Sequence, residues 1–125
     1  GWNHVMLVYS GTTLKAFLNS SSIGTNTGMY AISTETLKLG RWVPNNDYAE
    51  ANIDEVSVFS SDESPNLDII YNSGTPGDIS SLTPLNWWRM GEGSTFPTIN
   101  DIGSGGSNAT MKNMSSANFV NDTPL

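Results

Sequence analysis

The chain begins with a stretch in which apolar and polar side chains alternate, and this stretch constrains the fold more than any other. Residues 2–19 read WNHVMLVYSGTTLKAFLN, and a Ser-Gly pair at positions 10 and 11 interrupts the alternation. A period of two is typical of β-strands, and glycine adopts the positive φ angles that tight turns need. Both faces of the first strand carry apolar side chains, which predicts a strand inside a two-layer sandwich. The sequence therefore predicts a β-hairpin in an all-β domain.

The rest of the chain alternates between short apolar runs and turn-rich segments. Strands are predicted at 29–40, 53–59 and 85–93, with a last pair of short strands or an edge segment at 111–120. Loops are predicted at 20–28, 41–51, 75–84 and 95–110. One short helix is predicted over 64–74, because Ser64 can cap it, Pro65 suits its first position and Gly74 ends it. Its apolar face comprises Leu67, Ile70 and Tyr71.

Composition limits the class of protein. The 125 residues fit one domain, 1–125, and the 37% hydrophobic and 14% charged content suits an all-β domain and not a disordered chain. The net charge is −7 and the five Lys and Arg residues are scattered, which excludes a basic face for nucleic acid. The absence of cysteine excludes disulfides and thiolate metal sites. No apolar run reaches the ~20 residues of a membrane-spanning helix, so no membrane partner is expected.

Two stretches together resemble the LamG-like, concanavalin A-like lectin/glucanase superfamily. Residues 2–19 resemble its Trp-x-His strand followed by a hairpin. Residues 51–74, ANIDEVSVFSSDESPNLDIIYNSG, resemble its strand, short helix and Tyr-Asn-Gly ending. The resemblance implies an antiparallel β-sandwich of the jelly-roll type with one short helix. Neither motif is catalytic in the family, so the resemblance says more about fold than about function.

Residues 86–125 form a tail that carries a narrower resemblance. The segment is similar to the C-terminal ends of LamG-like proteins of marine phages and ocean metagenomic sequences, and it also resembles the opening strand of ordinary LamG-like domains. An opening-type strand placed last, in a chain that lacks several N-terminal strands of the family, implies a truncated or circularly permuted jelly roll. Because exposed strand edges pair with other chains, a homo-oligomer is expected, on an extracellular or virion surface.

Asp54 and Glu55 stand side by side in the predicted strand 53–59. Neighbours in a strand point to opposite faces, so these two carboxylates are not expected to meet at one glycosidic bond. A glycosidase needs two carboxyl groups in one cleft, about 5–5.5 Å or about 6.5–9.5 Å apart. The glucanases of the resembled family carry Glu-x-Asp-x-Glu on one strand, whereas Glu50, Asp54 and Glu55 are spaced differently. The two acids are therefore predicted to be structural.

Other residues are expected to support the fold together with these acids. A buried carboxylate needs a partner, and Arg41 or Arg89 would supply one. At least one of Trp87 and Trp88 is expected to face the core, and the alternative is an exposed stacking surface of Trp87, Trp88 and Met90. Arg89 and Glu92 are expected to form a local ion pair. The structural motif predicted from the sequence comprises Asp54, Glu55, Trp88, Arg89 and Glu92.

The loop rich in Pro and Asn holds the expected ligand-binding residues. Trp42 and Tyr48 would stack on a sugar ring, while Asn45, Asn46 and Asp47 would supply hydrogen bonds or calcium ligands. The alternative is an ordinary turn around a packed tryptophan, since Pro, Asn and Asp are common turn formers.

Asp47 and Asp101 are the candidate calcium ligands of this sequence. Asp101 would act with Ser104 and Asn108 of a Gly-rich segment. Because Ca²⁺ takes six to eight oxygen ligands and this segment holds one acid, a Gly/Ser turn is the favoured interpretation there.

The expected function is that of a non-catalytic binding or structural module. Its partners would be carbohydrate or neighbouring protein subunits. The alternative is an oligomerising structural protein without a small-molecule ligand, and a glycoside hydrolase is least favoured. The sequence has no nucleophile elbow and no phosphate loop. His4, the one histidine, lies in mid-strand and is expected to pack or to lie at the surface and not to join a catalytic triad.

Overall fold

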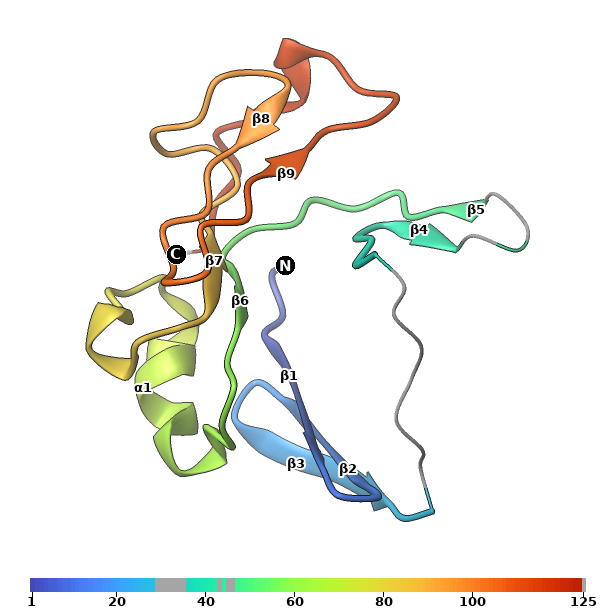
Figure 1. The fold of residues 1–125 in the computed structure, drawn as a ribbon, viewed down its shortest axis with the longest axis vertical. Coiled ribbons are helices and arrows are strands. Elements are labelled where there is room, and N and C mark those ends of the chain that lie inside the picture. The colour runs from blue at the N-terminus through green and yellow to red at the C-terminus, as the bar shows by residue number, and fades with distance from the viewer. Residues whose placement is uncertain (29–35, 43, 45–46, 125) are drawn as a thin grey trace.

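The computed structural model describes residues 1–28, 36–42, 44 and 47–124, which form a mostly β structure with antiparallel sheets and one short helix (Figure 1). These sheets are small and separate. The largest contains β1 (Val5–Ser10), β2 (Thr13–Leu18) and β3 (Ser21–Asn26) in that order. Three two-stranded pairs follow: β4 (Arg41–Trp42) with β5 (Asp47–Tyr48), β6 (Val56–Val58) with β7 (Asn86–Trp88), and β8 (Thr98–Ile99) with β9 (Ala109–Thr110).

The predicted N-terminal hairpin is confirmed. β1 and β2 pair in an unbroken antiparallel register from Val5 opposite Leu18 to Ser10 opposite Thr13. Gly11 in the turn has a φ of +61°, a conformation that costs glycine little. Local alternation and one turn signal were sufficient to predict this element.

One face of this hairpin contradicts the prediction of an interior strand. Val5, Leu7 and Tyr9 are 61%, 64% and 46% exposed. On the other face Val8 is buried, at 8% exposure. Leu18, opposite Val5 and on the same face, is also exposed. The sheet is therefore covered on one face only. The prediction failed because an apolar pattern shows which side chains a strand is able to bury and not what packs against them.

β3 occupies a segment that was predicted to be a loop, so that prediction is wrong. All six of its residues are exposed, and it pairs with β2 with a register shift between Ala16 and Phe17. Pairing supplies the backbone N–H and C=O groups with hydrogen bonds, and it needs no apolar side chains. The polar composition that indicated a loop therefore did not prevent a strand.

Several other predicted boundaries are corrected. Of the strand predicted over 29–40, residues 29–35 lie outside the described part, and 36–40 form no strand. The loop predicted over 41–51 contains the short β4–β5 pair. The strand predicted over 53–59 is shortened to β6. It begins only after Glu55, because the φ of +50° at Glu55 lies outside the extended region.

The tail follows a different course from the one predicted. The segment 95–110, expected to be a loop, contains β8 and β9. The segment 111–120, expected to hold two short strands or an edge segment, contains the 3₁₀ turn Ser116–Asn118 instead. A capping box between Ser115 and Asn118 closes this turn and satisfies its backbone groups locally.

The predicted helical segment is confirmed, in three consecutive pieces. The 3₁₀ turn Ser64–Asn66 leads into α1 (Leu67–Tyr71), and the 3₁₀ turn Asn72–Gly74 follows. The predicted cap is corrected: Ser64 lies inside the first turn, and Asp62 accepts hydrogen bonds from its backbone N–H and its hydroxyl. Leu67 is buried and anchors α1.

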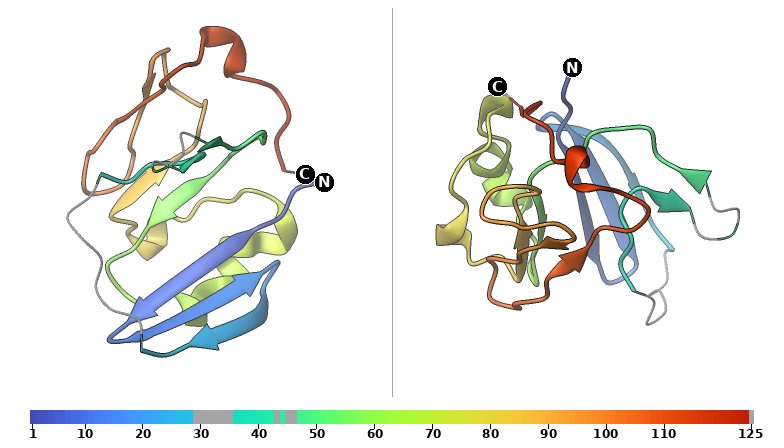
Figure 2. Two further views of the ribbon diagram at one scale, coloured as in Figure 1. Left: turned by 90° about the vertical axis from the view of Figure 1, so that its right-hand side faces the viewer. Right: turned by 90° about the horizontal axis from the view of Figure 1, so that it is seen from above.

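The core is small and lies around β7. It consists of Val8, Leu67, Ile79, Trp87 and Trp88, each between 5% and 8% exposed. Both tryptophans of β7 are buried, so the alternative of an exposed Trp87–Trp88 stacking surface is wrong. The two ends of the chain lie side by side (Figure 2), where the Trp2 indole N–H donates to Asp122 over 3.3 Å. Among the described residues, no helix is both long and apolar enough to cross a membrane.

Candidate functional site

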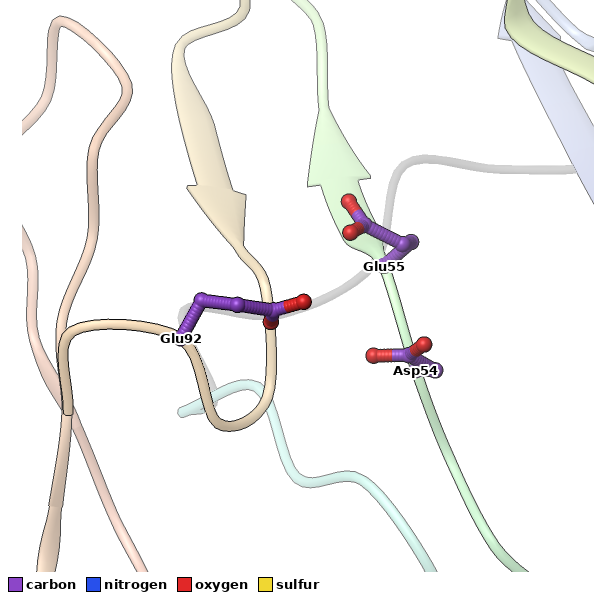
Figure 3. Close-up of side chains that lie close together, drawn as sticks. All are labelled: Asp54, Glu55 and Glu92. Carbon is purple, nitrogen blue, oxygen red and sulfur yellow. The ribbon is translucent and has the colours of Figure 1, made fainter. Parts of the chain in front are cut away.

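Three carboxylates converge at the ends of β6 and β7. Oxygen atoms of Asp54, Glu55 and Glu92 all lie within 4.8 Å of one another (Figure 3). Glu92 reaches from the loop after β7 toward the two acids that precede β6. The prediction that Asp54 and Glu55 point apart is wrong, because neither lies in the strand and the positive φ of Glu55 turns the backbone between them.

Glu55 joins β6 to β7 through both of its carboxylate oxygens. It accepts a hydrogen bond from the Trp87 indole N–H over 2.8 Å and forms an ion pair with the Arg89 Nε, also at 2.8 Å. Arg89 lies over the Trp87 ring, 5.4 Å from its centroid. Arg89 was one of the two arginines expected as a partner for these acids. The hydrogen bond from Arg89 to Glu55 raises the pKa of the guanidinium.

Asp54 differs from Glu55 in its electrostatic surroundings. Burial raises the pKa of Asp54, and the negative charges of Glu55 and Glu92 raise it further. A hydrogen bond from the Glu55 backbone and the more distant charge of Arg89 lower this pKa, but not enough to reverse the shift. Glu92 pairs loosely with Arg89 at 3.9 Å, which is the expected local ion pair.

This acidic cluster is able to hold a metal ion, since it offers three carboxylates from two parts of the chain. Sequence analysis missed the cluster as a metal candidate, because Glu92 is distant in sequence and the acids before β6 were assigned to opposite faces. The ligands present fit a hard cation only in part. Both oxygens of Glu55 already accept an N–H donor, and Arg89 brings a positive charge into the cluster.

Both carboxylate oxygens of Asp101, a candidate calcium ligand, accept hydrogen bonds from other residues of the chain. One of its oxygens accepts the backbone N–H groups of Trp87 and Gly103, both at 2.8 Å. The other accepts the Asn86 side-chain amide at 2.6 Å and the Ser107 backbone N–H at 2.7 Å. Desolvation by itself raises the pKa of Asp101, but these four donors outweigh it and hold the pKa below its usual range. Asp101 thus ties the Gly-rich segment to β7.

The glycines of this segment allow a close approach to β7. A Cβ atom on Gly103 would lie 2.6 Å from the carbonyl oxygen of Leu85, and one on Gly105 would lie 2.8 Å from the same oxygen. Asn108, a proposed calcium ligand, instead accepts the Asp101 backbone N–H through its side-chain oxygen. The calcium hypothesis for Asp101 stays a prediction, and the observed contacts give the residue a structural role.

The predicted ligand-binding loop is described only in part. Asn45 and Asn46 lie outside the described residues, as does the side chain of Trp42. Asp47 and Tyr48 are exposed on β5. The Arg41 guanidinium lies 5.8 Å from the centroid of the Tyr48 ring. Of the candidate residues in this loop that the structure describes, Asp47 and Tyr48 do not line the cavity described below. Its ligand-binding role stays a prediction.

A cavity of about 800 Å³ lies beside Asp54 and Glu55. Its walls come from the start of β1, the segment 51–57, the end of α1 with the residues after it, and the C-terminal residues near Asp122. Trp2 and Tyr71 supply aromatic walls. These parts of the chain are far apart in sequence, so no local pattern indicated this site.

Polar groups hold two walls of this cavity in place. Asp122 accepts the Trp2 indole N–H through one oxygen and the Asn52 side-chain amide, at 2.7 Å, through the other. His4 packs against Tyr71 with 5.7 Å between the ring centroids. The His4 Nδ1 atom is buried without a hydrogen-bond partner, and burial lowers the pKa of the imidazole. His4 is therefore a half-buried wall residue, in keeping with the packing role expected for it.

The model of the concanavalin A-like lectin/glucanases superfamily matches residues 1–66, just over half of the chain. The chain belongs to this superfamily. No curated protein and no solved structure matches it. The resemblance proposed from residues 2–19 and 51–74 is thereby confirmed at the level of the superfamily.

The matched part of this superfamily member includes β1 to β6, with Asp54 and Glu55, and ends at the 3₁₀ turn before α1. The tail with β7, Glu92 and Asp101 lies outside it. Because β7 is antiparallel to β6, the tail supplies the strand that completes this pair. Superfamily membership implies a jelly-roll sandwich, of which the described structure shows only small separate sheets. The superfamily includes lectins and glucanases, so membership leaves binding and hydrolysis open.

Proposed function

We propose that this superfamily member is a non-catalytic carbohydrate-binding module that holds a sugar in the cavity beside Asp54. The observation that carries the proposal is the lining of that cavity. Trp2 and Tyr71 supply apolar ring surfaces, and Asn52, Asp54 and Asp122 lie among them as hydrogen-bonding groups. Sugar sites combine an aromatic surface with a few fixed polar groups. The hydrogen bond from Trp2 to Asp122 orients the indole before any ligand arrives.

The bonding of Glu55 supports binding without hydrolysis. The three acids are close enough that distance alone does not distinguish a lectin from a glycosidase. A nucleophile or general base must have a carboxylate oxygen available to the substrate or to water. Both oxygens of Glu55 are instead held by Trp87 and Arg89. We therefore expect no release of reducing sugar from oligosaccharides that the module binds.

Titration of immobilised or labelled glycans against two matched variants tests the proposal. Trp2→Ala removes an aromatic wall of the cavity and should weaken binding at least tenfold. Tyr48→Ala removes an exposed aromatic side chain of the predicted loop and should leave binding unchanged. The opposite result would place the sugar at the loop, and an array on which no glycan binds would contradict the proposal.

A second candidate function, self-association as a structural module, is favoured by the open face of β1 and β2. Val5, Leu7, Tyr9 and Leu18 are each more than a third exposed on this face. Contiguous apolar patches of this kind mark interaction sites on many soluble proteins. We propose a second copy of the chain as the partner. Light scattering should give a dimer mass for the natural chain and a monomer mass for Leu7→Lys. A monomer mass for both would remove this candidate.

Calcium is the ion that we propose for the acidic cluster, because carboxylate oxygens suit hard cations. With Glu55 committed to other partners, we expect millimolar affinity at best, as in weak extracellular sites. A small rise in melting temperature on adding calcium, absent from Glu92→Gln, would support the site. Identical melting in calcium and in chelator would contradict it. A location on an extracellular or virion surface stays a prediction.

A further inference from the structure

We propose that the cavity beside Asp54 selects sugars by charge, accepting neutral and amino sugars and rejecting those that carry carboxylate or sulfate groups. The inference rests on the proposed carbohydrate-binding function and narrows its ligand class. It follows from the charged groups that line the cavity, from the way in which each is paired, and from the shape of the site.

The lining of the cavity is acidic. Asp54, Glu55 and Asp122 contribute three carboxylates, and none of the described side chains in the lining belongs to Lys or Arg. The chain as a whole carries a net charge of −7, so more distant charges reinforce this sign.

The three carboxylates are not equivalent toward a ligand. Glu55 is neutralised by its ion pair with Arg89. Asp122 forms no ion pair with any described residue, but each of its oxygens accepts an N–H donor, from Trp2 and from Asn52. Asp54 lies between the negative charges of Glu55 and Glu92 and accepts one backbone hydrogen bond, from Glu55. Asp54 is therefore the lining carboxylate most able to interact with an incoming charged group.

Neutral, cationic and anionic sugars interact differently with the carboxylates of the cavity lining. The hydroxyls of a neutral sugar donate to carboxylate and amide oxygens and accept from amide N–H groups, so they replace most of their hydrogen bonds to water on entering the cavity. A sugar ammonium gains an ionic hydrogen bond, which is stronger than a neutral one. A uronate or sulfate would place a second negative charge beside Asp54 in a partly buried site, where repulsion is screened less than in water.

A matched panel of oligosaccharides tests this selectivity. Glucose, galactose and mannose oligomers are each titrated in neutral, amino and uronic forms by calorimetry at pH 7, at low salt and in chelator, so that calcium does not neutralise the acidic cluster. We expect the amino form to bind at least tenfold more tightly than the uronic form of the same sugar. The difference should shrink as salt is added, because screening weakens ionic contacts.

Two variants locate the effect at the cavity. Asp54→Asn keeps the shape of the side chain and removes its charge, so it should reduce the ratio of amino to uronic affinity at least threefold. Asp68→Asn removes the same charge from an exposed position of α1, outside the cavity lining, and should leave the ratio unchanged. Thermal unfolding of both variants serves as the check that each is folded.

The outcomes separate this inference from the function on which it rests. Binding of uronic forms as tightly as amino forms overturns the charge selectivity but leaves carbohydrate binding intact. An unchanged ratio in Asp54→Asn also overturns it. If none of the nine oligosaccharide classes binds, carbohydrate binding itself is contradicted.

Discussion

The β1–β3 sheet and the β6–β7 pair are held in contrasting ways. The sheet has the longer strands and the unbroken hairpin register, yet the side chains on one of its faces are exposed. The β6–β7 pair has three residues in each strand, yet both tryptophans of β7 are buried. Strand length and pairing therefore do not measure how well a strand is packed.

The difference lies in side-chain hydrogen bonds. Trp87 and Trp88 donate their indole N–H groups to Glu55 and to the Ser107 carbonyl, and Asp101 accepts four donors around β7. On the exposed face of β1, the aliphatic side chains of Val5 and Leu7 have no polar atoms with which to form such hydrogen bonds. The short pair depends on a few polar side chains, whereas the long sheet depends on its backbone ladder and on one buried face.

The largest effect is expected when Asp101 is removed. Asp101→Ala leaves four N–H donors around β7 without their acceptor and should lower the free energy of unfolding by about 3 kcal/mol. Urea denaturation measures this loss, and hydrogen exchange should show faster exchange around β7 than in β1 and β2. Asp68→Ala is the control, since its carboxylate lies on the exposed side of α1. A loss spread evenly over both regions would contradict the contrast.

A smaller loss is expected from Glu55→Gln. Glutamine keeps one acceptor oxygen but gives up the ion pair with Arg89, so the free energy of unfolding should fall by about 1.5 kcal/mol. Trp87 fluorescence reports the local change and urea denaturation the global one. Glu92→Gln, which removes the looser partner of Arg89, should cost much less. Equal losses from the two variants would show that the close ion pair between Glu55 and Arg89 contributes no more than the looser pair between Glu92 and Arg89.

Lowering the pH should reduce the free energy of unfolding through different groups of the two regions over different pH ranges. Burial lowers the pKa of His4 below 6.5, so the unfolded chain takes up the proton first and stability falls as pH drops below about 6.5. The lowered pKa of Asp101 gives stability that is present above about pH 4 and lost as pH falls further. The raised pKa of Asp54 acts in the opposite direction as the carboxyl becomes protonated.

His4→Gln isolates the first of these steps. The glutamine side chain cannot ionise, so the part of the pH slope that lies below about pH 6.5 and comes from His4 should disappear, with an effect smaller than that of Glu55→Gln. Thermal unfolding at successive pH values gives the slope. An unchanged slope in this window would assign it to other groups.

The smallest change in stability is expected on the exposed sheet face. Leu7 is 64% exposed, so Leu7→Lys should alter the free energy of unfolding of the monomer by no more than about 0.5 kcal/mol. Denaturation at a protein concentration low enough to prevent association measures it. A loss of several kcal/mol would mean that this face is covered in solution and would remove the contrast between the two regions.

Sequence analysis predicted some elements and missed others for identifiable reasons. The hairpin and the helical segment were correct, since their signals lie within a few residues of one another. β3 was missed because its polar residues carry no strand signal and its pairing comes from β2. For Asp101 a signal was present: the Gly103 N–H bonds to a carboxylate two residues earlier, a turn that Asp residues commonly form.

The acidic cluster shows where reasoning from the pattern alone goes wrong. Alternation along an extended strand separated Asp54 from Glu55, but the backbone leaves the extended region at Glu55 itself. No propensity argument predicts a positive φ at a glutamate, because such a conformation persists only when surrounding contacts favour it. Trp87 and Arg89, distant in sequence, supply those contacts.

The amino-acid sequence by itself determined the β class, the hairpin, the helical segment and the superfamily, because period, turn residues and family motifs act over short distances along the chain. Only the tertiary structure decided which sheet face is covered, which acids meet and which wall residues enclose a cavity. Those features depend on contacts between residues 2–4, 51–57, 71 and 122, and on backbone turns that the contacts hold in place.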